Sequence, residues 1–579
     1  MIYRLSDNVI SPLGETTEEN YQALKAGRSA LCRYTGRWGI PEPFTASLFT
    51  DEQTAALAVE GLTRFESLAF RSAGKAVKAS GIDVSGNRTL FILSTTKANV
   101  ELLSGDAEKD ALYAPGAAAK RIATALGVTT EPMVVCNACI SGVAAIVLAL
   151  RLLDAGLYDN AVICGADVQS KFTVSGFQSL KAVSEESCRP FDIERLGLNL
   201  GEAAATLVVS RAYPKSHTAE EQQLWTIERG AVRNDAFHIS SPSKNGEGAR
   251  MALSAVLQGI GNADSLAFIN AHGTATMFND QMESVAIERA GLSTVPVNGL
   301  KGYFGHTLGA AGLLETIISM AAIDDHTLLA TRGFEECGVS GKIRLSAEHG
   351  TTDKQHFIKM ISGFGGCNGT LYAKKELPTA FTPQSQTVVP TTKTHTVRLT
   401  PTSLNIDGRD VSVQETGASL LTWLYKQHVN DYPKYYKMDG LSRLGLVATE
   451  LLLKQEGHQR FEACEDRAVI LFNNSSSVGA DRKYMASIAE TDYFPSPSVF
   501  VYTLPNIVTG EIAMRNLYPG ETSFYITNRR DDQLAWDVVC ASFADPATKS
   551  IIGGWIDYQD DSHFEANLYI VESASTGTK

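Results

Sequence analysis

A cysteine lies at the point where a strand is expected to give way to a helix. Residues 134–142 (VVCNACISG) are typical of a short buried strand and its turn, and residues 143–155 form an apolar helical pattern that Gly156 ends. Backbone N–H groups and the positive end of the helix dipole favour a thiolate at such a turn, so Cys139 is a candidate nucleophile. A small buried cysteine with no chemical role is the alternative, and it stays open until an acid or base partner is found.

Strands and helices alternate along the first 375 residues. Strands are expected at residues 89–94, 161–167, 204–210 and 266–270, and helices near residues 18–26 and 63–80. This alternation predicts an α/β fold with a largely buried sheet. The glycine-punctuated loop at residues 189–202 separates two halves of similar organisation, which we place at residues 1–210 and 211–375.

Composition excludes several classes of function. A chain of 579 residues exceeds what one hydrophobic core usually supports, so at least two domains are expected. The net charge of −13 disfavours binding to nucleic acid or to an anionic membrane. The sequence contains neither an apolar run long enough to span a bilayer nor a signal peptide, which favours the cytoplasm. Nine scattered cysteines predict no disulfide framework, and the single C-x-x-C pair, Cys136 and Cys139, lacks the partners of a zinc or redox site.

Two histidines stand in turns of small residues. His272 directly follows the expected strand at residues 266–270, and His306 lies in a glycine-rich turn before an apolar helix. A single histidine is more often a surface or structural residue, but the helix dipole biases a histidine at a helix N-terminus toward the neutral form. A third turn, residues 361–369 (ISGFGGCNG), carries Phe364 as its one large apolar residue, placed to act as a movable plug.

Five segments together resemble one family, the elongating β-ketoacyl-acyl-carrier-protein synthases of the thiolase superfamily. They are NACISG at residues 137–142, RPFDIERLGLNLGE at 189–202, AHGTATMFND at 271–280, KGYFGHTLGAAGLLE at 301–315 and GFGGCN at 363–368. Their order is that of the family. The resemblance implies a thiolase-like layered αβαβα fold built from two similar halves, assembled as a homodimer or as a heterodimer with another synthase-like subunit.

The resemblance implies a decarboxylative Claisen condensation between an acyl thioester and malonyl-acyl carrier protein, in fatty acid or polyketide chain elongation. Cys139 would accept the acyl chain, and His272 and His306 would polarise the malonyl carbonyl while CO₂ leaves. Neither a metal nor a bound cofactor is expected, because the phosphopantetheine of acyl carrier protein carries both substrates.

The family also implies three supporting residues. Lys301 would support the histidine pair, Glu315 would join the same network, and Phe364 would gate the site, its backbone N–H completing an oxyanion hole with that of Cys139.

Three departures from the usual motifs indicate a divergent subgroup of the family. Aryl polyene and other polyketide pathways are among those that it could serve. Leu196 replaces an aspartate, Ala203 a glycine and Cys367 a threonine. Two other functions stay open: a non-catalytic subunit like a chain-length factor, and a thiolase that uses free coenzyme A. Cys139 argues against the first, because such subunits resemble synthases that have lost this residue.

The last two hundred residues echo the first half. Residues 376–395, rich in Pro, Thr and Gln, are typical of a linker. Four stretches then repeat the N-terminal pattern in order: residues 440–451, 468–475, 523–530 and 550–557. Asn528 falls where Cys139 would be, and neither histidine motif follows. We therefore predict that residues 396–579 are a non-catalytic synthase-like half-domain; an unrelated α/β domain is the alternative.

Carrier proteins are acidic, so a locally basic entrance is expected on this acidic chain. The candidates are one helical face and one adjacent pair: Arg71, Lys75 and Lys78, with Lys120 and Arg121.

Overall fold

Two β-sheets form the framework of the computed structural model, which describes residues 1–212, 223–258, 260, 263–376, 391–457, 462–489 and 492–573. The first sheet has the order β1 (Ile2–Ile10), β8 (Ala203–Ser210), β6 (Asn160–Asp167), β4 (Thr89–Ser94) and β5 (Met133–Val135). The second has the order β9 (Leu224–Asn234), β15 (Cys367–Glu376), β14 (His356–Gly363), β10 (Leu266–Asn270) and β11 (Val297–Asn298). All residues of β4 and β8 are buried, as in sheets covered on both faces.

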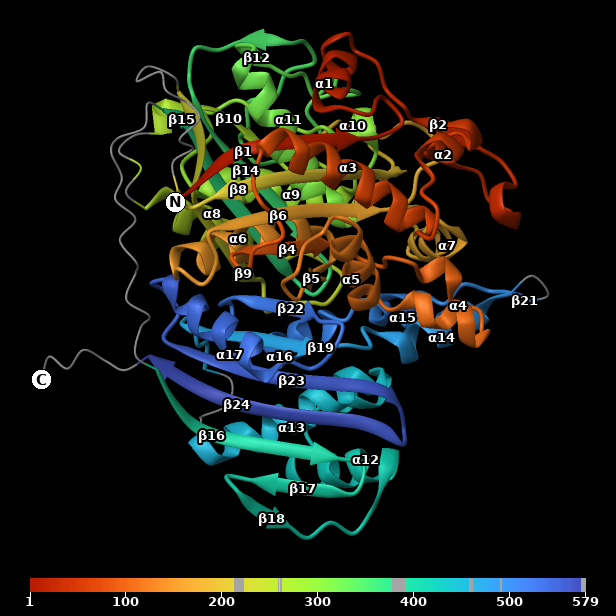
Figure 1. The fold of residues 1–579 in the computed structure, drawn as a ribbon, viewed down its shortest axis with the longest axis vertical. Coiled ribbons are helices and arrows are strands. Elements are labelled where there is room, and N and C mark those ends of the chain that lie inside the picture. The colour runs from red at the N-terminus through yellow and green to blue at the C-terminus, as the bar shows by residue number, and fades with distance from the viewer. Residues whose placement is uncertain are drawn as a thin grey trace, which may run out of the picture.

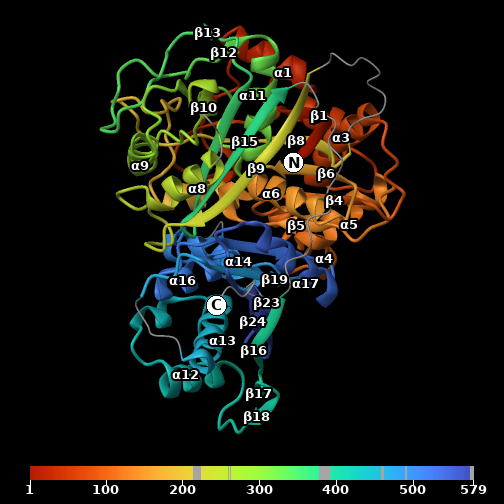
Figure 2. The ribbon, with the colours of Figure 1, turned by 90° about the vertical axis from the view of Figure 1, so that its left-hand side faces the viewer.

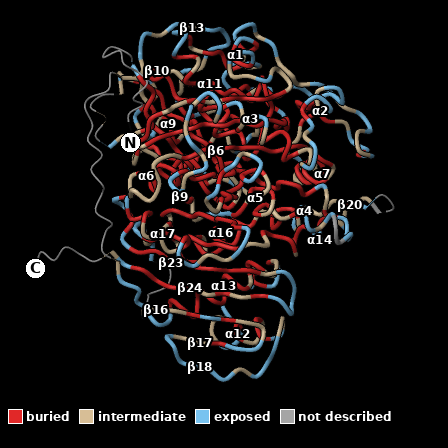
Figure 3. Tube along the Cα trace, viewed as in Figure 1, coloured by how far each residue is buried: buried red, intermediate tan, exposed pale blue. Residues whose placement is uncertain are grey.

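Helices lie between and outside the sheets. α6 (Ser141–Asp154) and α11 (Ala311–Asp324) fill the space between them, and both are buried almost all round, as their continuous apolar sequence requires. α3 (Arg64–Ser80) and α5 (Pro115–Ala125) cover the outer face of the first sheet. α8 (Glu247–Leu257) and α9 (Met277–Arg289) lie outside the second (Figure 2). The predicted αβαβα layering is confirmed, and buried residues run through its centre (Figure 3).

A third set of strands continues the first sheet. Outward from the junction the order is β22 (Thr522–Ile526), β19 (Arg467–Asn473), β23 (Ser550–Asp560), β24 (His563–Ser573) and β16 (Thr391–Thr400), followed by the short strands β17 (Ser403–Ile406) and β18 (Arg409–Val411). The parallel and antiparallel pairings of the first five repeat those of β5, β4, β6, β8 and β1. Figure 1 shows the two sets as one succession of strands from top to bottom. We call residues 391–573 the half-domain.

The helices of the half-domain repeat this correspondence. α13 (Gly440–Glu456) has 17 residues, as α3 has, and packs on β23 and β24 as α3 packs on β6 and β8. α16 (Ile507–Asn516) packs on β22, and α17 (Asp532–Ala541) packs on β23 and reaches α6. Further helices are α7 (Lys171–Ser179), α14 (Val478–Ser487) and α15 (Pro497–Phe500).

A buried aspartate plays the same structural part in both copies. Asp167, at the end of β6, accepts hydrogen bonds from the Thr95 hydroxyl at 2.7 Å and the Thr96 N–H at 3.0 Å. Asp557, in β23, accepts them from the N–H and the hydroxyl of Ser475 at 3.0 and 2.7 Å. In the first copy only, Asp167 also accepts the N–H of Gly309 at 2.7 Å, which ties it to the turn after His306.

The expected linker differs from the structure at both ends. Glu376 is the last residue of β15, and residues 391–395 belong to β16. They pair with β24, so the half-domain begins at Thr391 and not at residue 396. The intervening residues 377–390 lie outside the described part of the chain. Within the described residues, no helix is both long and apolar enough to cross a membrane.

The junction between β5 and β22 joins equivalent strands. They pair antiparallel, with Val135 opposite Tyr525. The side chain of Asn137 extends the pairing, because its amide accepts the N–H of Phe524 at 2.7 Å and donates to the carbonyl of Thr522 at 3.1 Å. The edge of the strand that leads to Cys139 is therefore closed by the half-domain.

Three buried ion pairs cross the same interface. Arg151 binds Glu521 at 2.7 Å, Arg233 binds Asp545 at 2.6 Å and Lys97 binds Asp481 at 2.7 Å. All six side chains are at least nine-tenths buried, so each charge depends on its partner across the interface.

Substituting Arg151→Met should lower the free energy of unfolding by about 3–5 kcal/mol, because Glu521 would keep a buried charge without its partner. Arg33→Met, which breaks an exposed pair with Glu185, should change it by only about 0–1 kcal/mol. Urea denaturation of both variants measures the difference, and equal midpoints would contradict this account of the interface.

Candidate active site

Cys139 lies in a tight turn between β5 and α6. The 3-10 turn Ala138–Ile140 connects the two elements, and Ala138 adopts a left-handed conformation with φ of 48°. Such a conformation in a non-glycine residue costs of order 1–3 kcal/mol and persists only where its surroundings hold it. Ser141 supplies that support, since its hydroxyl accepts the N–H of Asn137 at 2.8 Å and donates to the carbonyl of Ala138 at 2.6 Å.

Both predicted histidines lie against Cys139. Their rings meet edge to face with centroids 4.9 Å apart and planes at 82°. One ligating atom from each of Cys139, His272 and His306 falls within 4.8 Å of the other two, and all three residues are buried. Among the described residues they also form the one group with donor atoms close enough to share a metal ion. The expectation that the site uses neither metal nor cofactor remains a prediction.

The surroundings of the histidines favour the neutral imidazole. Burial, with Lys301 and Lys359 adding repulsion, holds the pKa of both rings well below the usual value. His306 Nδ1 accepts the N–H of Leu308 at 3.3 Å, so the neutral ring carries its proton on Nε2. In the described part of the chain, His306 Nε2 and His272 Nδ1 are buried without a hydrogen-bond partner. Each is available to a substrate atom.

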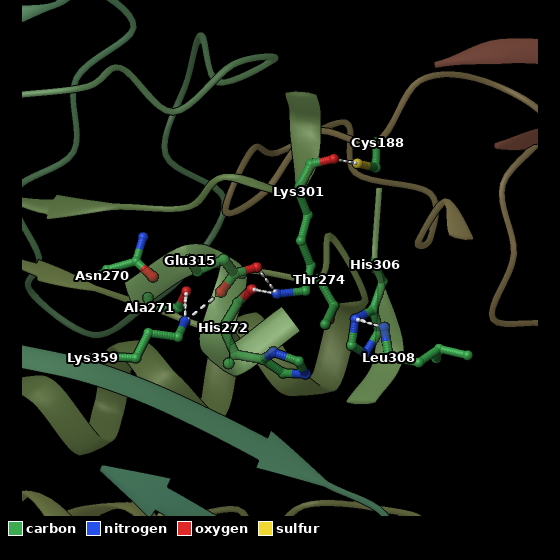
Figure 4. A network of polar contacts seen from close by, with 12 residues as sticks. Cys188, Asn270, Ala271, His272, Thr274, Lys301, His306, Leu308, Glu315 and Lys359 are labelled. Carbon is green, nitrogen blue, oxygen red and sulfur yellow. Dashed lines mark hydrogen bonds and ion pairs between the residues drawn. The ribbon is translucent and has the colours of Figure 1, made fainter. Parts of the chain in front are cut away.

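A buried carboxylate and two lysines stand behind His272 (Figure 4). Lys301 Nζ donates to the carbonyl of His272 at 2.6 Å and pairs with Glu315 at 2.7 Å. Lys359 pairs with the other oxygen of Glu315 and donates to the carbonyl of Ala271 at 3.1 Å. Burial alone would raise the pKa of Glu315, but the two ammonium groups hold it below its usual value. The structure thus brings Lys301 and Glu315 together beside the histidines.

Lys359 was missed by sequence reasoning. It is fully buried, and burial together with Lys301 lowers its pKa to about 8. The available signal is its position, since it is the only charged residue in the apolar strand FIKMIS at residues 357–362. A lysine inside a buried strand requires a partner, and Glu315 is that partner.

Glu283 and Asp280 were also not assigned roles. Glu283 accepts the backbone N–H groups of His272 and Gly273 at 2.6 and 2.8 Å, and Asp280 accepts that of Thr274 at 3.0 Å. Both therefore orient the loop that carries His272. Burial raises the pKa of Glu283 to about 7 and that of Asp280 to about 6.

The protonation state of Cys139 differs from the sequence expectation. Burial raises the pKa of its thiol to about 12, despite the attraction of Lys301. Desolvation of the charged form outweighs the local field of the turn and helix end, which the sequence argument had taken to favour the thiolate. The unliganded site therefore holds a neutral thiol beside two neutral imidazoles.

The three residues open into a cavity of about 380 Å³. Phe364 lies in its wall and stacks on Phe177, with ring centroids 5.9 Å apart. The lining also includes exposed apolar side chains, Leu196 at 68%, Met277 at 57% and Phe278 at 75% exposure. We call these three residues the apolar rim. Leu196 is one of the three motif departures noted in the sequence.

None of the five candidate docking cations lines this cavity. Lys75 pairs with Glu15, Lys120 with Glu131 and Arg121 with the buried Glu66. Arg71 donates to the carbonyls of Leu57 and Ala58. Lys78 is exposed in the last turn of α3.

A buried cysteine next to two imidazoles is an arrangement suited to acyl transfer through a thioester. Family comparison agrees: the "Beta-ketoacyl synthase, N-terminal domain" matches residues 6–215 and the "Beta-ketoacyl synthase, C-terminal domain" matches residues 224–335. The chain belongs to the β-ketoacyl synthase family.

Individual relatives match the same region. The chain is 25% identical to 3-oxoacyl-[acyl-carrier-protein] synthase 2 of Vibrio cholerae over 406 residues, covering 63% of this chain and 97% of the relative. The ishigamide ketosynthase/chain length factor superposes with a TM-score of 0.57 at 25% identity, over 64% of this chain and 98% of that one. The PfaC keto synthase-chain length factor has a TM-score of 0.76 at 15% identity, over 100% of this chain and 79% of that one, so its fold includes the half-domain.

Alkylation of Cys139 by iodoacetamide should rise about tenfold per pH unit from pH 7 to beyond pH 9, because a thiol with a raised pKa forms more thiolate at each step. Mass spectrometry of the peptide containing Cys139 measures the rate, with the exposed Cys32 as internal reference. A plateau below pH 8 would indicate a thiolate already formed at neutral pH and would contradict the burial argument.

Proposed function

We propose that this protein condenses an acyl group, loaded on Cys139, with a malonyl thioester carried by acyl carrier protein, releasing CO₂ and forming a β-ketoacyl thioester. The observation that carries the proposal is the meeting of Cys139, His272 and His306 within 4.8 Å in a buried cavity. A nucleophile next to neutral hydrogen-bond donors is what acyl transfer followed by decarboxylation requires.

The first step is thioester exchange. Cys139 Sγ attacks the acyl carbonyl, the bond from the acyl carbon to the pantetheine sulfur breaks, and the thiol proton passes to the departing sulfur. Because the thiol is neutral, an imidazole must relay this proton, and His272 is the ring proposed for it, since Leu308 occupies the acceptor nitrogen of His306. The carrier leaves with a free thiol.

The second step is decarboxylation. Loss of CO₂ from the malonyl thioester leaves its electron pair on the enolate, whose oxygen takes a hydrogen bond from His306 Nε2–H and a second from His272. The nearby ammonium groups of Lys301 and Lys359 oppose protonation of both rings, so they remain neutral donors. Both rings are buried, and the lower local dielectric strengthens both hydrogen bonds.

The third step joins the two carbon chains. The enolate carbon attacks the acyl carbonyl on Cys139, the new carbon–carbon bond forms, and the carbon–sulfur bond to Cys139 breaks. The Cys139 sulfur leaves as a thiolate and takes up one proton from solvent water, which replaces the proton lost to pantetheine in the first step, and the product is longer by two carbons. During this collapse the backbone N–H groups of Cys139 and Phe364 are the proposed oxyanion hole.

The carrier protein is supported as partner by the relatives, named acyl-carrier-protein synthases. Loss of CO₂ from a malonyl unit, with extension of the acyl chain by two carbons, fits fatty acid and polyketide elongation equally. A non-catalytic role like that of a chain-length factor is disfavoured by the intact cysteine and histidines. The half-domain has no such residues in the corresponding turn, and we propose that it is non-catalytic.

We also propose an oligomeric state and a cellular location for the protein. A homodimer, or a heterodimer with another synthase-like subunit, must use a surface other than the outer edge of β5, since β22 is already paired there. The cytoplasm is the proposed location, where acyl carrier protein would be met.

Wild-type protein incubated with acyl- and malonyl-carrier protein should give CO₂ and a β-ketoacyl-carrier product, and Cys139→Ala should give no condensed product. Mass spectrometry of the carrier follows the reaction. A thiolase would require acetyl-CoA and be indifferent to the carrier. No product, together with no acylation of Cys139, would contradict the proposed function.

Phe278→Ala should raise KM for malonyl-carrier protein about tenfold and leave KM for malonyl-pantetheine unchanged, because the apolar rim would contact the carrier and not the arm. Phe494→Ala is the matched control, since Phe494 is 78% exposed and does not line the cavity. Equal KM changes with both substrates would place Phe278 against the substrate arm and exclude the rim from carrier docking.

A further inference from the structure

A short turn connects the second histidine to the helix that follows it. His306 is followed by the 3-10 turn Leu308–Ala310, from which α11 continues. Leu308 adopts a left-handed conformation with φ of 52°, and its N–H reaches back to His306 Nδ1 at 3.3 Å (Figure 4). This hydrogen bond places the imidazole proton on Nε2, the nitrogen that donates to the enolate in the proposed decarboxylation. The tautomer of His306 therefore depends on where the turn holds Leu308.

The backbone of the next residue in the turn, Gly309, is held by two side chains. Asp167, at the end of β6, accepts the N–H of Gly309 at 2.7 Å. Ser94, at the end of β4, donates its hydroxyl to the carbonyl of Gly309 at 2.9 Å. Both side chains are buried, where a hydrogen bond is electrostatically stronger than in water. We call Ser94 and Asp167 the clasp.

The turn is also packed closely against its neighbours. A Cβ atom on Gly309 would lie 2.6 Å from Thr95 Cα and 2.9 Å from Asp167 Oδ2, so the backbone of the turn rests directly on the ends of β4 and β6. The start of α6 is in contact as well, since a Cβ atom on Gly142 would lie 3.1 Å from the carbonyl oxygen of Gly309. Close packing of this kind leaves the turn one position while the clasp is intact.

The half-domain shows the function of the equivalent aspartate where no histidine turn follows. Asp557 accepts the N–H and the hydroxyl of Ser475, which ties β23 to the loop after β19. Asp167 ties β6 to the loop after β4 in the same way, through Thr95 and Thr96. In the described part of the chain the hydrogen bonds of Asp557 stay within its own loop, whereas Asp167 has the further bond to the histidine turn. The structural function that both copies share is therefore separable from the contact with that turn.

We infer that the clasp holds His306 in the tautomer that donates from Nε2, so that Ser94 and Asp167 are positioning residues for decarboxylation. This inference deepens the proposed condensation and rests on it. The contacts form one continuous series: the clasp fixes Gly309, the adjoining Leu308 presents its N–H, and that N–H occupies His306 Nδ1. With the clasp broken, the turn can move away and the ring can place its proton on Nδ1, where it cannot reach the enolate.

The two half-reactions should respond differently to the clasp. Acyl loading of Cys139 uses His272 as the proposed relay and does not need the proton on His306. Decarboxylation does need it, and it can be followed without an acyl group on Cys139. The bond between the carboxyl carbon and the methylene carbon of malonyl-pantetheine breaks, and its electron pair passes into the enolate. The enolate carbon then takes a proton from solvent water, which gives CO₂ and acetyl-pantetheine.

Asp167→Ala should lower the rate of acetyl-pantetheine formation about 30-fold, because the N–H of Gly309 loses its acceptor and His306 loses its fixed tautomer. The rate of Cys139 acylation by butyryl-pantetheine should change less than about twofold. Ser94→Ala removes only the bond to the carbonyl of Gly309 and should lower the decarboxylation rate about threefold. Mass spectrometry of the thioesters and of the intact full-length protein measures the two rates.

Asp167→Asn is the conservative variant. The amide oxygen of asparagine can still accept the N–H of Gly309, and its NH₂ group can donate to the Thr95 hydroxyl, which is free to reverse its direction. Decarboxylation should stay within about threefold of the wild-type rate. Two-bond ¹⁵N NMR spectra of histidine-labelled protein, assigned with His306→Ala, should show His306 Nδ1 unprotonated in wild type and Asp167→Asn, and partly protonated in Asp167→Ala.

Asp557→Ala is the matched control, because it removes a buried acceptor from the equivalent position of the half-domain. It should lower the midpoint of urea denaturation, as Asp167→Ala does, and leave both rates and the His306 signal unchanged. If Asp167→Ala does not fold, Ser94→Ala decides the question with the same two rates.

Equal losses in both half-reactions, an unchanged decarboxylation rate, or an unprotonated His306 Nδ1 in Asp167→Ala would overturn the inference and leave the condensation standing. Wild-type protein that neither accepts the butyryl group nor decarboxylates malonyl-pantetheine would overturn the condensation, and the inference with it.

Discussion

The outer edge of β5 is the constraint on which the active site depends. The strand is three residues long, ends four residues before the nucleophile, and would expose unpaired backbone groups if it were the last strand of its sheet. β22 completes the pairing, and Asn137 extends it into the turn that carries Cys139. Because the half-domain also supports the Phe364 turn through Asn506, the elements that face the substrate are held from both parts of the chain.

The electrostatics of the site follow from an unequal pairing. One carboxylate, Glu315, faces two ammonium groups, Lys301 and Lys359, in a region without access to water. The excess positive charge acts on the neighbouring imidazoles, where it adds to burial in disfavouring their protonated forms. The lysines therefore do two things at once: they hold the backbone of the His272 loop, and they keep both rings neutral.

Much of the fold could be predicted from local pattern, and much of the site could not. The order of strands and helices follows from apolar runs such as that of α6, which only a buried helix tolerates. The meeting of Cys139 with His272 and His306 could be expected only from family resemblance, since residue spacing says nothing about contacts 133 and 167 positions apart. Lys359 was missed because the sequence does not show which carboxylate pairs with a single lysine in a strand. The prediction of a thiolate at Cys139 was wrong, because the sequence shows where a helix begins but not how deeply the thiol is buried.

Covalent attachment of the half-domain has a consequence for how the protein responds to dilution. A subunit that donates a cavity wall from a separate chain is lost by mass action when its concentration falls below the dissociation constant. Here Phe500 and Asn506, which contact the wall residues Phe177 and Phe364, belong to the same chain as Cys139, so the effective concentration of the half-domain is fixed by the chain itself. Each catalytic site therefore has one half-domain beside it, whatever the expression level of the protein.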